Sequence, residues 1–322
     1  MLWRKIQKNN FRDIKKLAHF LELDPEKLSH HPRFPLNVPM RLAEKMRKGN
    51  LSDPLFRQFV PLPEENLISS NYVEDPVNDK SFCKTSKLLQ KYEGRALILT
   101  TSACAMHCRF CFRQNFDYAS KNMFEKELQL IKEDPSLKEI ILSGGDPLSL
   151  SDLDLKTLLD ALALIPHVKI IRFHTRFPIG IPERIDASFI QTLKECQKQI
   201  VFLVHVDHPL ELDSDVLTAL KQLQALGIPL LMQTVLLKGV NDDFSVLHEL
   251  FFLAVSHGII PYYLHQLDKV KGASHFEVDE IVGHSLMKKL SGSLPGYAVP
   301  RYVREIPGNP SKTLLSSSFA KN

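Results

Sequence analysis

The sequence lacks the segments that would carry a protein into or through a membrane. Its first residues, MLWRKIQKNN, contain no apolar core and no small-residue cleavage site, so we expect no secretory signal. No apolar run approaches the roughly 18 residues that a membrane span requires. We therefore expect a cytoplasmic protein without a membrane partner, in a compartment that keeps thiols reduced.

The chain also has little net charge and few cysteines. A formal charge of +4 over 322 residues is modest and does not indicate a nucleic-acid partner. Only five cysteines are present, and clustered cysteines in a reducing compartment favour metal binding or catalysis over disulfides. With 44% hydrophobic residues, the chain can form one large domain with an extension, or two domains.

Two parts of the chain differ in pattern. Residues 1–90 combine short helical patterns with proline-broken segments, and we expect a mostly helical N-terminal extension. Beyond them, six short apolar runs alternate with helical patterns, which predicts βαβ units and a parallel sheet in the α/β class. The runs lie at 95–101, 138–144, 168–175, 199–206, 228–236 and 259–266.

Six strand–helix units are too few for a closed eight-stranded barrel and predict a partial (β/α)6 barrel. We assign residues 91–275 to this barrel and residues 276–322 to a C-terminal segment. In parallel barrels the chemistry gathers at the carboxyl ends of the strands. The residues that directly follow each apolar run are therefore the first candidates for a site.

Three cysteines lie together after the first predicted strand. Cys104, Cys108 and Cys111 stand within eight residues, in TSACAMHCRFCF. Three thiolates can hold a 4Fe–4S cluster by three irons, which leaves the fourth iron open to a ligand. A structural zinc site usually needs four ligands in paired form, and no second pair follows. A ferredoxin-like site with the distant Cys83 as fourth ligand stays open.

Other polar groups follow the next strands. Gly144 and Gly145, in LSGGDPL, form a turn whose backbone a ligand can approach closely. Thr175 and Arg176 end the third predicted strand, where Arg176 is either a partner for an anionic carboxylate or a solvated loop residue. Gln233 ends the fifth.

The remaining histidine and cysteine signals favour structural roles. We interpret His205 and His208, in VHVDHPLEL, as hydrogen-bonded residues at a strand end and not as metal ligands. Cys196 lies in a helical pattern and is interpreted as a structural thiol. Lys312 follows PGNPS, a segment that predicts a tight loop. It is either a surface lysine or the covalent anchor of a carbonyl cofactor such as pyridoxal phosphate (PLP).

These motifs resemble those of a known family. The C-x3-C-x-Φ-C pattern, with Phe110 before the last cysteine, is similar to the signature of radical S-adenosylmethionine (SAM) enzymes, whose usual fold is a partial barrel. In that family the open iron binds SAM, and reductive cleavage gives a 5′-deoxyadenosyl radical. Nearly the whole chain resembles lysine 2,3-aminomutases, through KYEGRALILTTSACAMHCRFCFRQ, LSGGDPL, TRFPIGIPERI, QTVLLKGVND, PYYLHQLDKVKGASHF and PGNPSK.

The resemblance implies three cofactors: a 4Fe–4S cluster, SAM and PLP. It implies that Lys312 carries PLP and that Arg95, with help from Lys91, holds the PLP phosphate. The residues it suggests for SAM are Gly144, Gly145, Asp146, Thr175, Arg176 and Gln233.

The resemblance also implies how the substrate L-lysine is bound. Arg113 matches the residue that binds the substrate carboxylate. Asp268 matches an acid that binds the distant ammonium group. Glu305 stands where the longer enzymes have a second such acid, an aspartate, so the charge is kept on a longer side chain.

The implied reaction converts L-α-lysine to (R)-β-lysine. The chain ends ten residues after Lys312, without the zinc-binding cysteines of longer members. It thereby resembles short bacterial members whose product a ligase attaches to elongation factor P (EF-P). A reductant such as flavodoxin or ferredoxin is implied. A radical SAM enzyme that uses another amino acid or no PLP, and a non-enzymatic iron–sulfur or zinc protein, stay open, as does a homo-oligomer.

Overall fold

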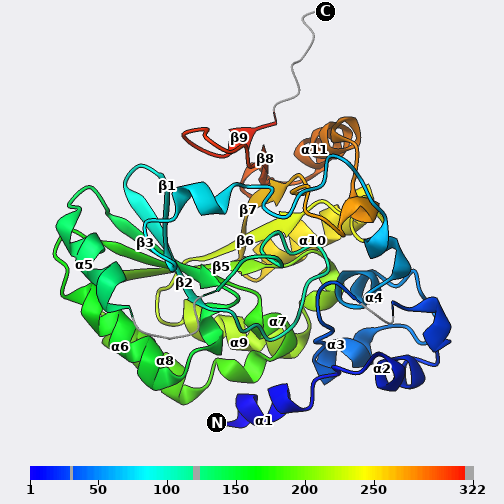
Figure 1. The fold of residues 1–322 in the computed structure, drawn as a ribbon, viewed down its shortest axis with the longest axis horizontal. Coiled ribbons are helices and arrows are strands. Elements are labelled where there is room, and N and C mark those ends of the chain that lie inside the picture. Colours follow the sequence, from blue (N-terminus) through cyan, green and yellow to red (C-terminus); the bar gives the residue numbers. More distant parts are fainter. Residues whose placement is uncertain (30–31, 119–123, 316–322) are drawn as a thin grey trace, which may run out of the picture.

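A nine-stranded, mostly parallel sheet forms the centre of the computed structural model, which describes residues 1–29, 32–118 and 124–315 (Figure 1). The strands follow one another in chain order, and the seven from β2 to β8 are parallel. The edge strands β1 and β9 pair antiparallel with their neighbours. The strands are β1 (Leu88–Tyr92), β2 (Arg95–Thr101), β3 (Glu139–Gly144), β4 (Ile170–Thr175), β5 (Gln199–His205), β6 (Leu230–Val235), β7 (Ile260–His265), β8 (Arg301–Arg304) and β9 (Thr313–Leu314).

The six predicted apolar runs coincide with β2 to β7, so the predicted open α/β barrel is confirmed. The sequence analysis missed β1, β8 and β9. Their sequences, LLQKY, RYVR and TL, are short or polar and contain no apolar run. These strands form because a neighbouring strand supplies backbone partners, which is a tertiary effect.

Helices connect the parallel strands and cover the outside of the sheet (Figure 1). Several begin at an aspartate or serine whose side chain accepts a first-turn backbone N–H, as Ser151, Asp186 and Asp213 do. Each buries an apolar face, such as Leu155, Leu158, Leu159 and Leu162 of α6. These helices are α5 (Glu125–Glu133), α6 (Asp152–Ala163), α8 (Ala187–Glu195), α9 (Ser214–Gln224), α10 (Phe244–Ser256) and α11 (Glu280–Ser293).

The N-terminal part packs into the same core as the barrel. One continuous hydrophobic cluster contains Trp3, Phe59 and the barrel residue Phe173. The Trp3 ring meets the Phe177 ring edge-on at 5.4 Å between centroids. We propose that the described residues of the three predicted segments, 1–90, 91–275 and 276–322, form one packed body. The helices involved are α1 (Leu2–Lys8), α2 (Ile14–Phe20), α3 (Met40–Lys45), α4 (Pro54–Phe59) and the short α7 (Phe177–Gly180).

Within the described ranges, no helix is both long and apolar enough to cross a membrane.

Candidate active site

A cavity of about 430 Å³ lies at the carboxyl ends of the parallel strands. Every residue that the sequence analysis assigned to a cofactor, to the substrate or to a metal lines this cavity. The candidates are spread over more than 200 residues of chain, from Lys91 to Lys312, and the parallel topology brings them together. Their roles are not settled by this shared position, and the contacts of each group are described in turn.

The cysteine loop follows β2 and is held by side chains from the N-terminal part. Gln7 Nε2 donates to the Cys104 carbonyl over 3.1 Å, and Asn10 Nδ2 donates to the Ala105 carbonyl over 2.7 Å. Asn37 Nδ2 also donates to the Cys104 carbonyl, over 3.2 Å. These contacts fix the loop backbone, and the thiols of Cys104, Cys108 and Cys111 form no disulfide among the described residues.

The environment of the three thiols opposes their ionisation. Burial, with Asp146 and the other thiols nearby, raises the pKa of Cys104 well above its usual range. Burial also raises the pKa of Cys108 to about 11, although Arg176 acts in the opposite direction. No group of three His, Cys, Asp or Glu side chains in the described part of the chain could hold a metal ion. A cubane cluster makes a different demand, because each thiolate binds its own iron.

Gly144 and Gly145 are needed for packing inside the protein. A Cβ on Gly144, whose φ is +119°, would stand 2.7 Å from the Thr101 carbonyl oxygen. A Cβ on Gly145 would collide with the Ala103 carbonyl oxygen. The two glycines therefore let the end of β3 pack against the start of the cysteine loop. The sequence analysis explained them by the approach of a ligand; the contacts show that the protein's own backbone already requires them.

Asp146 joins the ends of β3 and β4. Its carboxylate accepts hydrogen bonds from Thr175 Oγ1 (2.8 Å) and from the backbone N–H of Leu148, Arg176 and Phe177. Burial raises the pKa of Asp146 to about 6, against the effect of these hydrogen bonds. Thr175 and Asp146 are hydrogen-bonded to each other, and this contact shapes the mouth of the cavity. Contact of either with SAM stays a prediction.

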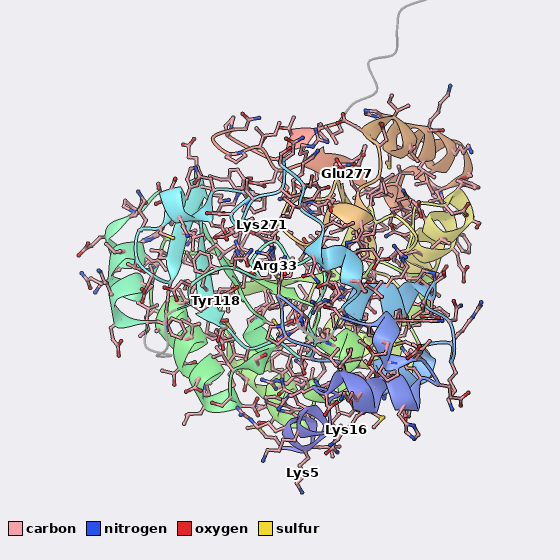
Figure 2. The ribbon with its side chains drawn as sticks, turned by 45° about the vertical axis from the view of Figure 1, so that its right-hand side comes forward. Lys5, Lys16, Arg33, Tyr118, Lys271 and Glu277 are labelled. Atoms are coloured by element: carbon pink, nitrogen blue, oxygen red, sulfur yellow. The ribbon has the colours of Figure 1, made fainter. Side chains whose placement is uncertain are left out.

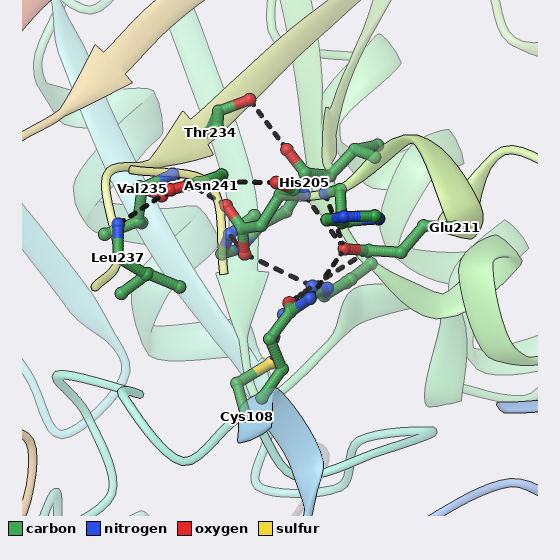
Figure 3. Close-up of polar contacts among 12 residues, drawn as sticks. Cys108, His205, Glu211, Thr234, Val235, Leu237 and Asn241 are labelled. Carbon is green, nitrogen blue, oxygen red and sulfur yellow. Dashed lines mark hydrogen bonds and ion pairs between the residues drawn. The ribbon is translucent and has the colours of Figure 1, made fainter. Parts of the chain in front are cut away.

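Arg176 is buried and paired, so it is not the solvated loop residue that one of the two predictions proposed. Its Nη1 donates to the Cys108 sulfur over 2.9 Å. Its Nη2 lies 2.8 Å from Glu211 Oε2 and 3.2 Å from Asp207 Oδ2, and it also donates to Gln58. Figure 3 shows this network between the labelled Cys108 and Glu211. The two carboxylates compensate the positive charge of the buried guanidinium. They also fix its orientation, so that one N–H points to the Cys108 sulfur.

Asp207 is held by the ends of β5 and β6. His205 Nε2 lies 2.8 Å from Asp207 Oδ2, and the Val235 N–H donates to Asp207 Oδ1 over 2.7 Å. Asn241 donates to the Asp207 and Val235 carbonyls, as the cluster of dashed lines in Figure 3 shows. His208 Nδ1 accepts from the Leu210 N–H over 3.2 Å. His208 thus has the hydrogen-bonded surroundings that were expected for it, whereas His205 Nε2 lies at ion-pair distance from Asp207 without a hydrogen-bond partner among the described residues.

Lys312 lines the same cavity and is paired with Glu305. Its Nζ lies 2.8 Å from Glu305 Oε2, and Tyr92 donates from its hydroxyl to Glu305 Oε1 over 2.6 Å. Burial acts to raise the pKa of Glu305, but Lys312 and Tyr92 outweigh it and lower that pKa. Burial raises the pKa of Asp268 to about 6; Glu305 adds to the rise and Lys312 opposes it.

Arg113 pairs with a residue that the sequence analysis did not find. Asp79 is 1% exposed, and its Oδ2 accepts from Arg113 Nε over 2.6 Å. Its Oδ1 lies 2.7 Å from Lys91 Nζ, which also donates to the Val77 carbonyl. Burial acts to raise the pKa of Asp79, but Arg113 and Lys91 outweigh it and lower that pKa. No local motif marks Asp79, because its segment YVEDPVND reads as an irregular loop.

Arg95 is different from the other cations of the cavity. Its guanidinium lies over the Tyr92 ring at 4.8 Å, and among the described residues it forms no ion pair. Burial lowers the pKa of both His174 and His265 well below its usual range, so both imidazoles are neutral at pH 7. Their Nε2 atoms are buried and have no hydrogen-bond partner in the described part of the protein. A cation and two polar nitrogens are thus available to a ligand.

Comparisons with known proteins agree with this geometry. Residues 98–251 match the model of the radical SAM superfamily. The chain is 39% identical to the L-lysine 2,3-aminomutase of Haemophilus influenzae, over 98% of this chain and 95% of that one. It is also 39% identical to the L-lysine 2,3-aminomutase of Escherichia coli, over 94% and 91%. A solved structure, Streptococcus suis SuiB bound to the precursor peptide SuiA, is similar with a TM-score of 0.50. At 16% identity over 63% of this chain and 46% of that one, it supports the fold alone.

Proposed function

Because the chain belongs to the lysine 2,3-aminomutase family of radical SAM isomerases, we propose that it converts L-α-lysine to (R)-β-lysine. The observation that carries the choice of substrate is the charge arrangement of the cavity. Arg113 offers a guanidinium, while Asp268 and Glu305 offer two carboxyl groups. Lysine complements both, since its α-carboxylate is negative and its side chain ends in an ammonium group.

The residues present fit the cofactors of such an enzyme. Cys104, Cys108 and Cys111 would hold the 4Fe–4S cluster, and the polar rim at Gly145 and Gln233 would meet SAM. When bound, these groups would supply the radical chemistry that activates a carbon–hydrogen bond of the substrate.

A PLP site also finds suitable residues in the cavity. Lys312 would carry PLP, and Arg95, which forms no ion pair among the described residues, would meet its phosphate. Lys91 is already paired with Asp79, so we propose that it acts mainly through that contact. When bound, PLP supplies an electron sink for the migrating amino group.

The chain's own residues bind and orient the substrate. Asp79 accepts from Arg113 Nε, and Ser143 Oγ accepts from Nη1 over 3.4 Å. Among the described residues this leaves Nη2 as the guanidinium nitrogen that would meet the α-carboxylate. Asp268 and Glu305 accept hydrogen bonds from the ε-ammonium group. An apolar part of the lining, which includes Phe110 and Leu203, excludes water from the reacting carbons.

Glu305 has a second task before the substrate arrives. Its Oε2 accepts a hydrogen bond from Lys312 Nζ, so it orients the amine on which PLP would be carried. Tyr92 donates to the other oxygen and fixes the carboxylate plane. The longer arm of Glu305, relative to the aspartate of longer family members, is compatible with this contact.

The test is anaerobic reconstitution with iron, sulfide and PLP, followed by product analysis with SAM and a reductant. We expect β-lysine from lysine, less product from ornithine, and none from glutamate, which would add a third negative charge beside two carboxylates. Equal turnover of glutamate would contradict the substrate. Turnover without PLP, or without its absorption band, would favour a radical SAM enzyme of another kind.

We also propose that the product is passed, in the cytoplasm, to a ligase that attaches it to elongation factor P. The support is the resemblance to short bacterial family members. Mass spectrometry of EF-P from cells with and without the gene tests this step. A modified EF-P mass that persists in the deletion strain would contradict it.

A further inference from the structure

The positive charge of the chain is concentrated in its first 20 residues. They contain six lysines and arginines and one aspartate, a formal charge of +5, whereas the rest of the chain carries −1. All six cations are exposed, and none forms an ion pair within the described part of the chain. The aspartate, Asp13, accepts from the Lys15 and Lys16 N–H groups as the cap of α2. This basic N-terminal surface consists of Arg4, Lys5, Lys8, Arg12, Lys15 and Lys16.

The basic N-terminal surface lies directly behind the cysteine loop. Gln7, on α1 between Lys5 and Lys8, donates to the Cys104 carbonyl, and Asn10 donates to the Ala105 carbonyl. Arg12 is close enough to act electrostatically on His107, which lies inside the cysteine loop. The positive charge therefore lies on a segment that directly contacts the backbone of the cysteine loop.

The surface is rigidly attached to the barrel. The Trp3 side chain is fully buried and packs edge-on against Phe177, and the Arg184 guanidinium lies 4.9 Å from the centre of its ring. Figure 2 shows the labelled Lys5 and Lys16 at one end of the molecule, where Figure 1 shows α1 and α2. A partner bound to these helices would therefore be held at a fixed position relative to the cysteine loop.

We propose that the basic N-terminal surface is the docking site of an acidic electron-donor protein that delivers one electron to the cluster. The donor loses one electron and the oxidised cluster gains it. This inference rests on the proposed binding of a cluster by Cys104, Cys108 and Cys111. Complementary charge increases the rate of encounter, and it brings the donor to the side of the molecule on which the loop lies. A nucleic acid would have no reason to bind beside these thiols.

The experiment measures cluster reduction and needs neither lysine nor PLP. Reconstituted protein is mixed in a stopped-flow instrument with the hydroquinone of an acidic flavodoxin, and bleaching of the cluster absorbance is followed. Reversal of three charges in Lys5→Glu/Lys8→Glu/Arg12→Glu should slow reduction about tenfold or more at low ionic strength. The difference from wild type should shrink as salt is added. The neutral variant Lys5→Gln/Lys8→Gln/Arg12→Gln should give an intermediate rate.

The matched control reverses three exposed lysines elsewhere, in Lys126→Glu/Lys132→Glu/Lys288→Glu. These residues lie on α5 and α11, away from α1 in Figure 1, and the change in net charge is the same. The control should be reduced at nearly the wild-type rate. All variants should be reduced equally fast by photoreduced deazaflavin, a small uncharged reductant that needs no docking.

Any result that differs from these expectations overturns the proposed docking site. Equal slowing in the control would show that only net charge matters. An unchanged rate in the N-terminal variant would show that the donor docks elsewhere. In either case β-lysine formation with a chemical reductant would leave the proposed function intact. A protein that acquires no reducible cluster would overturn both.

Discussion

Arg176 donates a hydrogen bond from Nη1 to the sulfur of Cys108 over 2.9 Å, and both side chains line the same cavity. A buried cation is thus in contact with one of the three thiols that the sequence marks as iron ligands. The contact depends on Glu211 and Asp207, which hold the guanidinium from the other side.

The first prediction concerns this cation. In Arg176→Met the carboxylates of Glu211 and Asp207 lose their buried partner, so the free energy of unfolding should fall by about 3–5 kcal/mol. The potential of a reconstituted cluster should also fall, because hydrogen bonds and positive charge near the sulfurs favour the reduced state. Glu211→Gln, which keeps the cation and removes a negative charge, should raise the potential. Urea unfolding measures the free energy, and redox titration followed by electron paramagnetic resonance measures the potential. Shifts of the potential with the same sign in the two variants would contradict the assignment.

The second prediction concerns the cysteines. Replacement of Cys104, Cys108 or Cys111 by Ala should abolish the visible absorbance of the cluster, and SAM cleavage with it, because each thiolate would bind one iron. Cys83→Ala and Cys196→Ala are the matched controls and should keep both properties. Cleavage of SAM by Cys108→Ala would exclude the three-cysteine site, and loss of the cluster in Cys83→Ala would favour the ferredoxin-like alternative.

The third prediction follows from the raised pKa of Asp268. Its carboxyl group, with a pKa of about 6 in the folded protein and an ordinary value of 3.8, binds protons more readily when folded. Its ionisation therefore opposes folding as the pH rises from about 4 through 6. Asp268→Asn should stabilise the protein at pH 7.5 by about 1–3 kcal/mol and have little effect at pH 4.

The same substitution should impair substrate binding. Loss of the ionised partner of the ε-ammonium should raise the KM for lysine strongly, since a buried charge partner is typically worth about 2–5 kcal/mol. Denaturant unfolding at the two pH values and kinetics on one preparation test the two effects together. An unchanged KM for lysine would contradict the acidic pocket, whatever the stability shows.

The fourth prediction concerns Asp79, which orients Arg113. Asp79→Asn should raise the KM for lysine and for ornithine by a similar factor, because in the proposed site Arg113 would meet the carboxylate that all amino acids share. The variant should also lose stability at neutral pH. The pKa of Asp79 is lowered on folding, so its stabilising effect is present above its ordinary pKa and is lost as the pH falls below about 4. A selective effect on lysine, with ornithine unaffected, would contradict the role given to Arg113.

The fifth prediction is that Lys312 carries PLP. Borohydride reduction of PLP-loaded protein, followed by peptide mapping, should find the pyridoxyl group on Lys312. Lys91, which lines the same cavity but is paired with Asp79, is the internal control. A label on Lys91 or on another lysine would refute the assignment. Lys312→Ala should keep the cluster, because its side chain has no contact with the cysteine loop among the described residues.

The sequence by itself determined the parallel strands and the position of the site. Six apolar runs predicted β2 to β7 correctly, because burial on both faces of a sheet demands near-continuous apolar residues within a short segment. The cysteine spacing and the strand ends then indicated that the cysteines, Gly145 and Arg176 face a common side, since parallel strands end on one side. Both signals are local, and a local signal can be seen without the fold. The other candidates, such as Arg113 and Asp268, were assigned through the family resemblance.

Only the tertiary structure decided how the charged groups are paired. Arg113 contacts Asp79 across 34 residues of chain, and Tyr92 contacts Glu305 across 213. Gly144 and Gly145 could be recognised as a turn, but the carbonyl groups that demand them belong to the end of β2 and to the loop that follows it. The energy of a buried charge depends on which opposite charge the packing brings within hydrogen-bond distance. No periodicity or spacing along the chain encodes that distance, and so the partners of Arg113, Arg176 and Lys312 appeared only when the strands were assembled into a sheet.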